Sequence, residues 1–311
     1  FADIKKREVK VLLTDSTNAM SPGYGRSELS IKEPLRKLIN QAEGRVFLTT
    51  FASNFWRLKS VIDICAAENK KLFIDGRGTQ ECIDTAERLG FTTPLKKVAV
   101  SIGALNRTPK NKLVVLLTGS QGERRASLSR IANQEHRRFK IAPGDLVIFS
   151  ARAIPGNEKN ILIVADLLKK QGAKILSTRD HPDIHVSGHA YSDELRELLR
   201  LLRPKHYVPI HGSYSHLTAN QAIGKEFEPH TKTTHLENNM VLELHPRKLT
   251  TKPHTIKSER LFVDDNSRFP LTYRTMQERL DIGENGLVIV TGALSKRHKR
   301  WIVSPKIKLI G

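Results

Sequence analysis

Two short segments, His185-Val-Ser-Gly-His189-Ala190 and Tyr207-Val-Pro-Ile-His211-Gly212, each set a histidine beside a glycine at the edge of an apolar run. Between them, leucines at helical spacing and the breaker Pro204 predict a helix over Ser192–Arg203. A strand, a histidine-bearing turn, a helix, a second strand and a second such turn bring the two imidazoles to the same end of a sheet. Imidazole at such a place can bind zinc or carry a proton near neutral pH.

Strand and helix patterns alternate upstream of these segments. The predicted strands are Arg45–Thr49, Lys71–Asp75, Lys112–Thr118, Asp145–Ser150 and Lys174–Ser177. The predicted helices are Ser27–Ala42, Phe55–Glu68, Thr79–Leu89, Glu123–Ala132 and Asn157–Gln171. This alternation indicates βαβ units and an α/β fold with a mainly parallel sheet. A further apolar strand is predicted near the start, over Val9–Leu13.

The pattern changes after His245. Pro246–His254 is polar and basic with two prolines, so we expect a linker there. Beyond it, Arg260–Asp264 and Leu287–Thr291 are rich in β-forming residues, with a predicted helix over Arg274–Leu280.

The chain is strongly basic. Its 311 residues contain 52 Lys+Arg against 32 Asp+Glu, a net charge of +20, which predicts a polyanionic partner. The basic clusters lie at Arg107–Lys112, Glu123–Arg130, His136–Lys140, Arg247–Lys252 and Lys296–Arg300. A solvated basic face is the plainer explanation for any one cluster.

The sequence lacks a run of 18 apolar residues, so no membrane partner is expected. Cys65 and Cys82 are expected to be free thiols.

Five further segments stand in a specific order with the two histidine turns. They are Leu12-Leu13-Thr14-Asp15-Ser16-Thr17-Asn18-Ala19, Phe51-Ala52-Ser53-Asn54, Leu117-Thr118-Gly119-Ser120-Gln121-Gly122-Glu123, Ser129-Arg130-Ile131-Ala132-Asn133, and Ile148-Phe149-Ser150 with Ile154-Pro155-Gly156-Asn157-Glu158. Taken together with the two turns, this series resembles the ribonuclease J family, in the β-CASP branch of metallo-β-lactamase-fold nucleases.

The resemblance implies a domain organisation. Residues 1–25 would end the first part of the metallo-β-lactamase domain, 26–180 would form the inserted β-CASP domain, and 181–245 would form the second part of the metallo-β-lactamase domain. Residues 246–311 would be a linker and a C-terminal β-rich segment. Residues 1–25 and 181–245 should then meet in space. The family's His-x-His-x-Asp-His motif is absent from the 311 residues. The chain is therefore expected to lack the first, metal-binding part of the αββα domain.

The resemblance also implies roles for three residues. His211 would be a metal ligand, and Asp15 with His189 would form a catalytic dyad that protonates the leaving 3′ oxygen. The cofactor would be zinc, two ions per complete site, with manganese or magnesium as other candidates. The alternatives are local: Asp15 in Asp-Ser-Thr-Asn favours an Asx-turn or a helix cap, and His189 favours a structural hydrogen bond.

Two segments are expected to bind substrate. The resemblance places phosphate at His185, Val186, Ser187, Gly188 and His189, and a nucleotide at Ser53, Asn54 and Phe55. Ser53 and Asn54 also precede a helix, so capping alone accounts for them. Tyr24, Trp56 and Phe149 are candidates to stack on bases, although core packing is the preferred expectation for each.

The resulting prediction is a zinc-dependent ribonuclease that cleaves RNA internally and from a 5′-monophosphate end. The alternative is a catalytically inactive RNA-binding or ribonucleoprotein scaffold derived from this family. A small-molecule hydrolase such as a β-lactamase is disfavoured by the charge. The expected partners are RNA, a second copy in a homodimer or homotetramer, and a ribonucleoprotein or RNA-degradation complex. The expected location is cytoplasmic.

Overall fold

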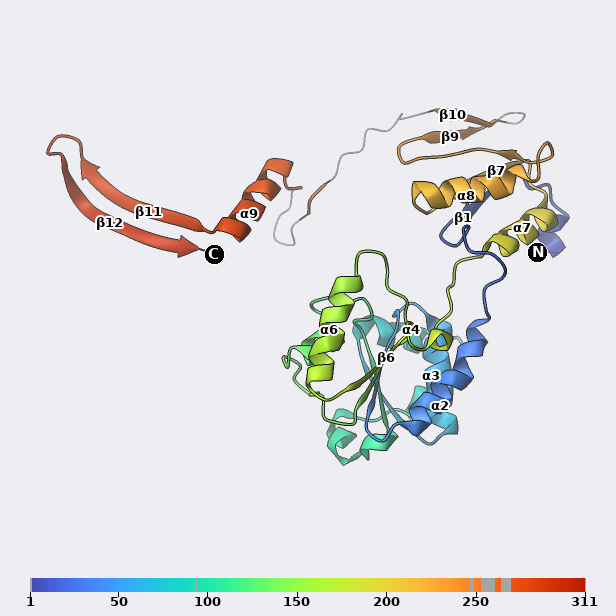
Figure 1. Ribbon diagram of the computed structural model, residues 1–311, viewed down its shortest axis with the longest axis horizontal. Helices are drawn as coiled ribbons and strands as arrows, with labels where there is room; N and C mark the ends of the chain where they lie inside the picture. The colour runs from blue at the N-terminus through green and yellow to red at the C-terminus, as the bar shows by residue number, and fades with distance from the viewer. Residues whose placement is uncertain (1, 93, 246–248, 253–260, 264–269, 311) are drawn as a thin grey trace. The chain divides into compact units, whose positions relative to one another are not determined.

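A computed structural model describes residues 2–92, 94–245, 249–252, 261–263 and 270–310. The chain divides into two compact units, Phe1–His235 and Leu236–Gly311 (Figure 1). The boundaries predicted from the sequence within the first unit stay a prediction. Within the described residues, no helix combines the length and apolarity that a membrane crossing needs.

The centre of the first unit is a parallel sheet of five strands. Its order is β3 (Lys71–Asp75), β4 (Leu113–Leu117), β2 (Val46–Thr49), β5 (Leu146–Phe149) and β6 (Lys174–Ser177). The middle strands are buried along their whole length, as a sheet covered on both faces requires. The predicted α/β fold with a parallel sheet is therefore confirmed.

Helices cover both faces of this sheet. They are α2 (Lys32–Gln41), α3 (Phe55–Ala67) and α4 (Arg77–Arg88) on one face, and α5 (Ser127–Ala132) and α6 (Glu158–Lys170) on the other. Figure 1 shows α6 and the pair α2 and α3 on opposite sides of the sheet. Side chains alternate between two buried clusters: Leu48 and Val114 pack under α2–α4, whereas Phe47 and Val115 pack under α5 and α6.

Two helix starts differ from their prediction by four residues or more. The helix expected over Ser27–Ala42 is a 3₁₀ turn at Glu28–Ile31 followed by α2, because Pro34 fits only the first turn of an α-helix. The helix expected over Glu123–Ala132 begins at Ser127. The remaining short 3₁₀ turns of the unit are Leu95–Lys97, Ile102–Arg107, Lys110–Lys112 and Pro182–Ile184.

A second, smaller sheet joins the beginning of the chain to the region after residue 200. Its parallel strands are β1 (Val11–Asp15), β7 (His206–Ile210) and β8 (Lys232–Thr233). Helices α7 (Ser192–Leu202) and α8 (Tyr214–Lys225) pack beside it around the buried Tyr207, and α1 (Ala2–Lys5) precedes it. The expected meeting of segments 1–25 and 181–245 is confirmed by the β1–β7 pairing.

The described residues of the second unit form two antiparallel strand pairs and a helix. Strands β9 (Val241–Leu244) and β10 (Leu249–Lys252) pair, and α9 (Tyr273–Asn285) precedes the pair β11 (Leu287–Ser295) and β12 (Arg300–Ile310). The linker interpretation of 246–254 was wrong for Leu249–Lys252, whose polar residues pair as an edge strand. Residues 246–248 and 253–254 lie outside the described residues. The next predicted strand, Arg260–Asp264, is described only over residues 261–263, and there Phe262 forms an isolated β-bridge with Leu271.

Candidate functional site

Strand pairing brings Asp15 to His211. In the parallel register of β1 and β7, Asp15 lies opposite Ile210, so the residue after Ile210 begins its turn beside the carboxylate. The backbone N–H of Ser16 donates to the His211 carbonyl (3.1 Å). His211 has a positive φ of 54°, and a Cβ at Gly212 would lie 2.8 Å from that of His216. The sharp turn expected from His-Gly is thus required by the packing.

A second contact brings His189 to the same place. The side-chain amide of Asn18 donates to the hydroxyl of Ser187 and to the carbonyl of His189, at 2.9 Å each. Asn18 also forms an isolated β-bridge with Tyr191. The loop that follows β1 therefore holds the His185–His189 segment through the Ser187 hydroxyl and the His189 carbonyl.

Asp15, His189 and His211 converge. Nδ1 of His189 lies 3.1 Å from one carboxylate oxygen of Asp15, and Nε2 of His211 lies 3.5 Å from the other. The two imidazoles stack with centroids 5.9 Å apart and planes 14° apart. One nitrogen or oxygen from each of the three residues lies within 4.8 Å of the others. Both histidines are exposed and Asp15 is half-buried, so solvent and substrate have access.

The local role considered for Asp15 is also present. The backbone N–H of Thr17 donates to Oδ1 of Asp15 (2.8 Å), which is the Asx-turn that Asp-Ser-Thr-Asn favours. The turn fixes the carboxylate while both of its oxygens still face the imidazoles. The structural and the catalytic interpretations of Asp15 are therefore compatible.

A buried polar network supports the carboxylate from below. Asn220 is fully buried, and its amide donates to the Thr14 hydroxyl, the Asp15 carbonyl and the Ser16 hydroxyl. The phenol of Tyr207 joins Thr14 and Asn220, and burial raises its pKa. The sequence analysis missed this network, because single polar residues inside apolar runs carry no signal of partners two hundred residues away.

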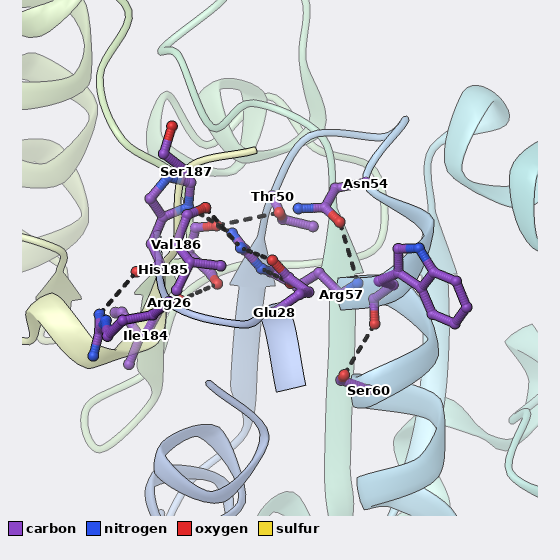
Figure 2. Close-up of polar contacts among 12 residues, drawn as sticks. Arg26, Glu28, Thr50, Asn54, Arg57, Ser60, Ile184, His185, Val186 and Ser187 are labelled. Carbon is purple, nitrogen blue, oxygen red and sulfur yellow. Dashed lines mark hydrogen bonds and ion pairs between the residues drawn. The ribbon is translucent and has the colours of Figure 1, made fainter. Parts of the chain in front are cut away.

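The segment expected to bind phosphate is held by Arg57, which the sequence analysis did not single out. The Arg57 guanidinium is completely buried and donates to the Ser150 carbonyl, and it pairs with Glu28 at 2.8 Å (Figure 2). It also lies 2.7 Å from Nδ1 of His185. Burial, and next the neighbouring Arg57 charge, lower the pKa of His185 to about 4. His185 is thus neutral at pH 7.

His185 and Val186 are consequently structural in this chain, whereas Ser187, Gly188 and His189 lie where a ligand can reach them. Val186 is buried, and Gly188 and His189 are exposed. The Ser187 hydroxyl accepts from Asn18 and from the backbone N–H of His189 (3.3 Å). Its own O–H therefore stays available to a phosphate oxygen.

The predicted nucleotide loop begins α3. Asn54 accepts from the backbone N–H of Arg57 as the helix cap, which confirms the capping explanation for this residue. Ser53 is exposed, and Phe55 is half-buried against Trp56 and Phe91.

The expectation of core packing was wrong for two of the three stacking candidates. Trp56 is 57% exposed and Tyr24 is 58% exposed, whereas Phe149 is buried as expected.

The glycine-rich loop after β4 is tightly packed. A Cβ at Gly122 would lie 2.6 Å from the Asn160 backbone, and the buried Gln121 forms hydrogen bonds with residues of the loop before α6.

Comparison with known proteins connects these positions to one family. Residues 43–168 match the family model "Ribonuclease J, beta-CASP domain", and residues 182–233 match "Zn-dependent metallo-hydrolase RNA specificity domain". Proteins named ribonuclease J from Corynebacterium glutamicum and Helicobacter pylori are each 33% identical to the chain, over 97% and 100% of its length. The one from Synechocystis is 36% identical over 95% of it. The chain belongs to the ribonuclease J family.

The chain spans about half the length of these ribonuclease J relatives. It covers 42% of the protein from Corynebacterium glutamicum, 45% of the one from Helicobacter pylori and 46% of the one from Synechocystis. Both matched regions carry candidate site residues of this chain. Ser53, Asn54 and Arg57 lie in the first, and His189 and His211 lie in the second. Asp15 lies outside both regions and joins the site through strand pairing.

The donor set fits a divalent metal. One carboxylate and two imidazoles within 4.8 Å are the ligand types and the ligand number of catalytic zinc sites, which keep a fourth position open. The exposure of both imidazoles leaves room for that position. The metal implied for the ribonuclease J family is therefore compatible with the side chains of this chain.

Proposed function

We propose that Asp15, His189 and His211 form part of the active site of a metal-dependent ribonuclease. One observation carries the proposal: Asp15 lies more than 170 residues before His189 and His211 in the sequence, yet one donor atom from each of the three side chains lies within 4.8 Å of the others at an exposed edge. Carboxylates and imidazoles so arranged can hold a metal or transfer a proton, and each of these contributes to the hydrolysis of a phosphodiester.

Asp15 and His189 act as the proton-transfer pair in this proposal. The carboxylate next to Nδ1 orients the ring and leaves Nε2 as the nitrogen that faces substrate. A proton held at Nε2 is positioned for the leaving 3′ oxygen. The network through Asn220 keeps the Asp15 backbone fixed while the proton moves.

His211 is the proposed metal ligand, and Asp15 shares the site through its second carboxylate oxygen. A bound divalent metal supplies Lewis acidity toward a phosphate oxygen. We propose zinc, with manganese or magnesium as substitutes.

The remaining residues bind substrate in this proposal. The free O–H of Ser187 donates to a phosphate oxygen, and the open backbone at Gly188 leaves room for the phosphate, with His185 and Val186 holding the loop in place. Ser53, Asn54 and Phe55 contact the next nucleotide.

The proposed substrate is RNA with a 5′-monophosphate end, with internal cleavage as a second activity. Self-association as a homodimer or homotetramer, an RNA-degradation complex and a cytoplasmic location are proposed with it.

The test uses the full-length gene product prepared with zinc or manganese and assayed on 5′-monophosphorylated RNA. His189→Ala is expected to slow hydrolysis by about 10²- to 10⁴-fold, the usual contribution of a general acid. His211→Ala is expected to lose hydrolysis and part of the bound metal, measured by elemental analysis. His230→Ala, which changes an exposed histidine outside both turns, is the matched control. An unaltered rate and metal content for His211→Ala would refute its role.

A non-catalytic RNA-binding scaffold is the second candidate. It is favoured by the net charge of +20, which by itself supports binding of a polyanion. Such a protein would bind RNA with a steep salt dependence and hold no metal. About two metal ions per chain in the full-length product would favour the enzyme.

A further inference from the structure

Four arginines surround one pocket at the end of the five-stranded sheet. They are Arg77, Arg130, Arg137 and Arg138, and the lining also includes Asp75, Gly76, Ser127 and His136. We call this the arginine pocket. It occupies about 420 Å³, within the range of ligand sites, and it shares no lining residue with the Asp15–His189–His211 cluster or with the segments around Asn54 and Ser187. Its arginines come from three separate parts of the sequence.

A buried pair builds the pocket. His136 is 7% exposed, and its Nε2 lies 2.8 Å from the Asp75 carboxylate at the end of β3. Nδ1 of the same ring accepts the backbone N–H groups of Arg138 and Phe139, at 3.2 Å each. The imidazole therefore fixes the short segment that presents Arg137 and Arg138. Ser127 ties the beginning of α5 to the same place by donating to the Asp75 carbonyl (3.0 Å).

The charges of the arginine pocket are not balanced. Asp75 is the single carboxylate among the lining residues, and it already contacts His136 and, at 3.6 Å, Arg138. Within the part of the chain that the structure describes, Arg77, Arg130 and Arg137 form no ion pair within 4.0 Å. Guanidinium groups crowded together repel one another unless an anion joins them, and their planar fork fits the oxygens of a phosphate group.

We infer that the arginine pocket binds phosphate groups of the RNA backbone, at nucleotides other than those at the scissile bond. This inference rests on the proposed function, which supplies RNA as the partner. The pocket lies where β3 and β4 end, the same edge of the sheet at which β2 leads into the Ser53–Asn54 loop. A Cβ built on Gly78, beside Arg77, would lie 3.8 Å from the Cβ of Ala52 in that loop. A strand of RNA that contacts the loop can therefore continue toward the pocket.

Binding of labelled single-stranded RNA by the full chain, without added metal, tests the inference. The variant Arg77→Gln/Arg130→Gln/Arg137→Gln leaves Arg138 on Asp75. Each lost phosphate contact lowers the slope of log affinity against log salt by about 0.7 on a single strand, so a fall of about 2 is expected. The matched control Arg88→Gln/Arg107→Gln/Arg179→Gln removes the same charge at exposed positions and is expected to retain most of the slope.

Three outcomes would overturn the inference: an unchanged slope in the pocket variant, an equal fall in the control, or competition by polyglutamate as strong as by RNA. Tight binding of inorganic phosphate or a mononucleotide with no loss of long-RNA affinity in the variant would also overturn it. If the triple variant melts at a lower temperature, Arg137→Gln alone, at an exposed position, is expected to lower the slope by about 0.7. Hydrolysis of a dinucleotide by the full-length product tests the active site independently.

Discussion

At the scale of the residue, Arg57 and His185 show how one loop of the site is held in place. A buried guanidinium needs all its donors bonded, and Arg57 meets this need with Glu28, a backbone carbonyl and His185. The imidazole must accept from Arg57, so it stays neutral. The loop that carries Ser187 and His189 therefore depends on the protonation state of its first residue.

This dependence predicts a pH effect on stability. The pKa of His185 is about 4 in the folded chain against an ordinary 6.5, so between these values the unfolded chain binds a proton that the folded chain does not. The free energy of unfolding should then fall as pH drops from 6.5 toward 4. His185→Asn keeps an acceptor for Arg57 and should give a shallower fall, measured by urea denaturation across this range. Equal slopes in the two proteins would assign the acid sensitivity to other groups.

The sequence was sufficient to predict the three residues of the cluster, because each stands in a short motif with its own turn residues. The sequence was insufficient to predict the residues that hold these three in place, Arg57 and Asn220. Arg57 occupies a position in α3 that reads as an ordinary polar helix residue, and Asn220 lies in a helix of low amphipathicity. Their partners, Glu28 and Thr14 among them, are distant in sequence, so burial and bonding emerge only from the tertiary fold.

At the scale of the element, the strands of the large sheet were predictable because they are short apolar runs between turn residues. The predicted Lys71–Asp75 and Lys174–Ser177 agree with β3 and β6 at both ends. Helix starts were less predictable. The residues before Ser127 form turns in which Glu123 and Thr118 accept local backbone N–H groups, and such side-chain bonds compete with a helix.

The contact between α8 and β7 gives an element-scale prediction. A Cβ at Gly224 would lie 2.5 Å from Cδ1 of the buried Tyr207 and 2.6 Å from Oγ1 of Thr233. Gly224→Ala should therefore lower the free energy of unfolding by about 1–3 kcal/mol, despite the better helix propensity of alanine. Gly283→Ala in α9 has nothing within 4 Å and should instead stabilise its helix by up to about 1 kcal/mol. Thermal or urea unfolding measures both; a neutral Gly224→Ala would show that the helix can shift.

At the scale of the whole molecule, burial is concentrated in one of the two compact units. All three hydrophobic clusters belong to the unit Phe1–His235. None of the described residues between 236 and 310 is buried, and β11 and β12 carry many exposed apolar side chains.

A shortened chain tests this distribution. A protein ending at His235 is expected to keep the main cooperative unfolding transition, because the buried apolar surface that drives folding is retained. Circular dichroism melting of the short and full chains measures it, with Arg57→Leu in the short chain as the control that should melt earlier. Loss of the transition on shortening would show that the second unit is needed for the first to fold.

The pairing of β1 with β7 also has a kinetic consequence. Residues Val11 and His206 are register partners, yet nearly two hundred residues separate them, and closing so long a loop costs conformational entropy before any contact is gained. The strands of the intervening parallel sheet pair over shorter sequence separations, and once this sheet has formed the effective loop between Val11 and His206 is shorter. The Asp15–His189–His211 cluster should thus be assembled late in folding, after the intervening parallel sheet has formed.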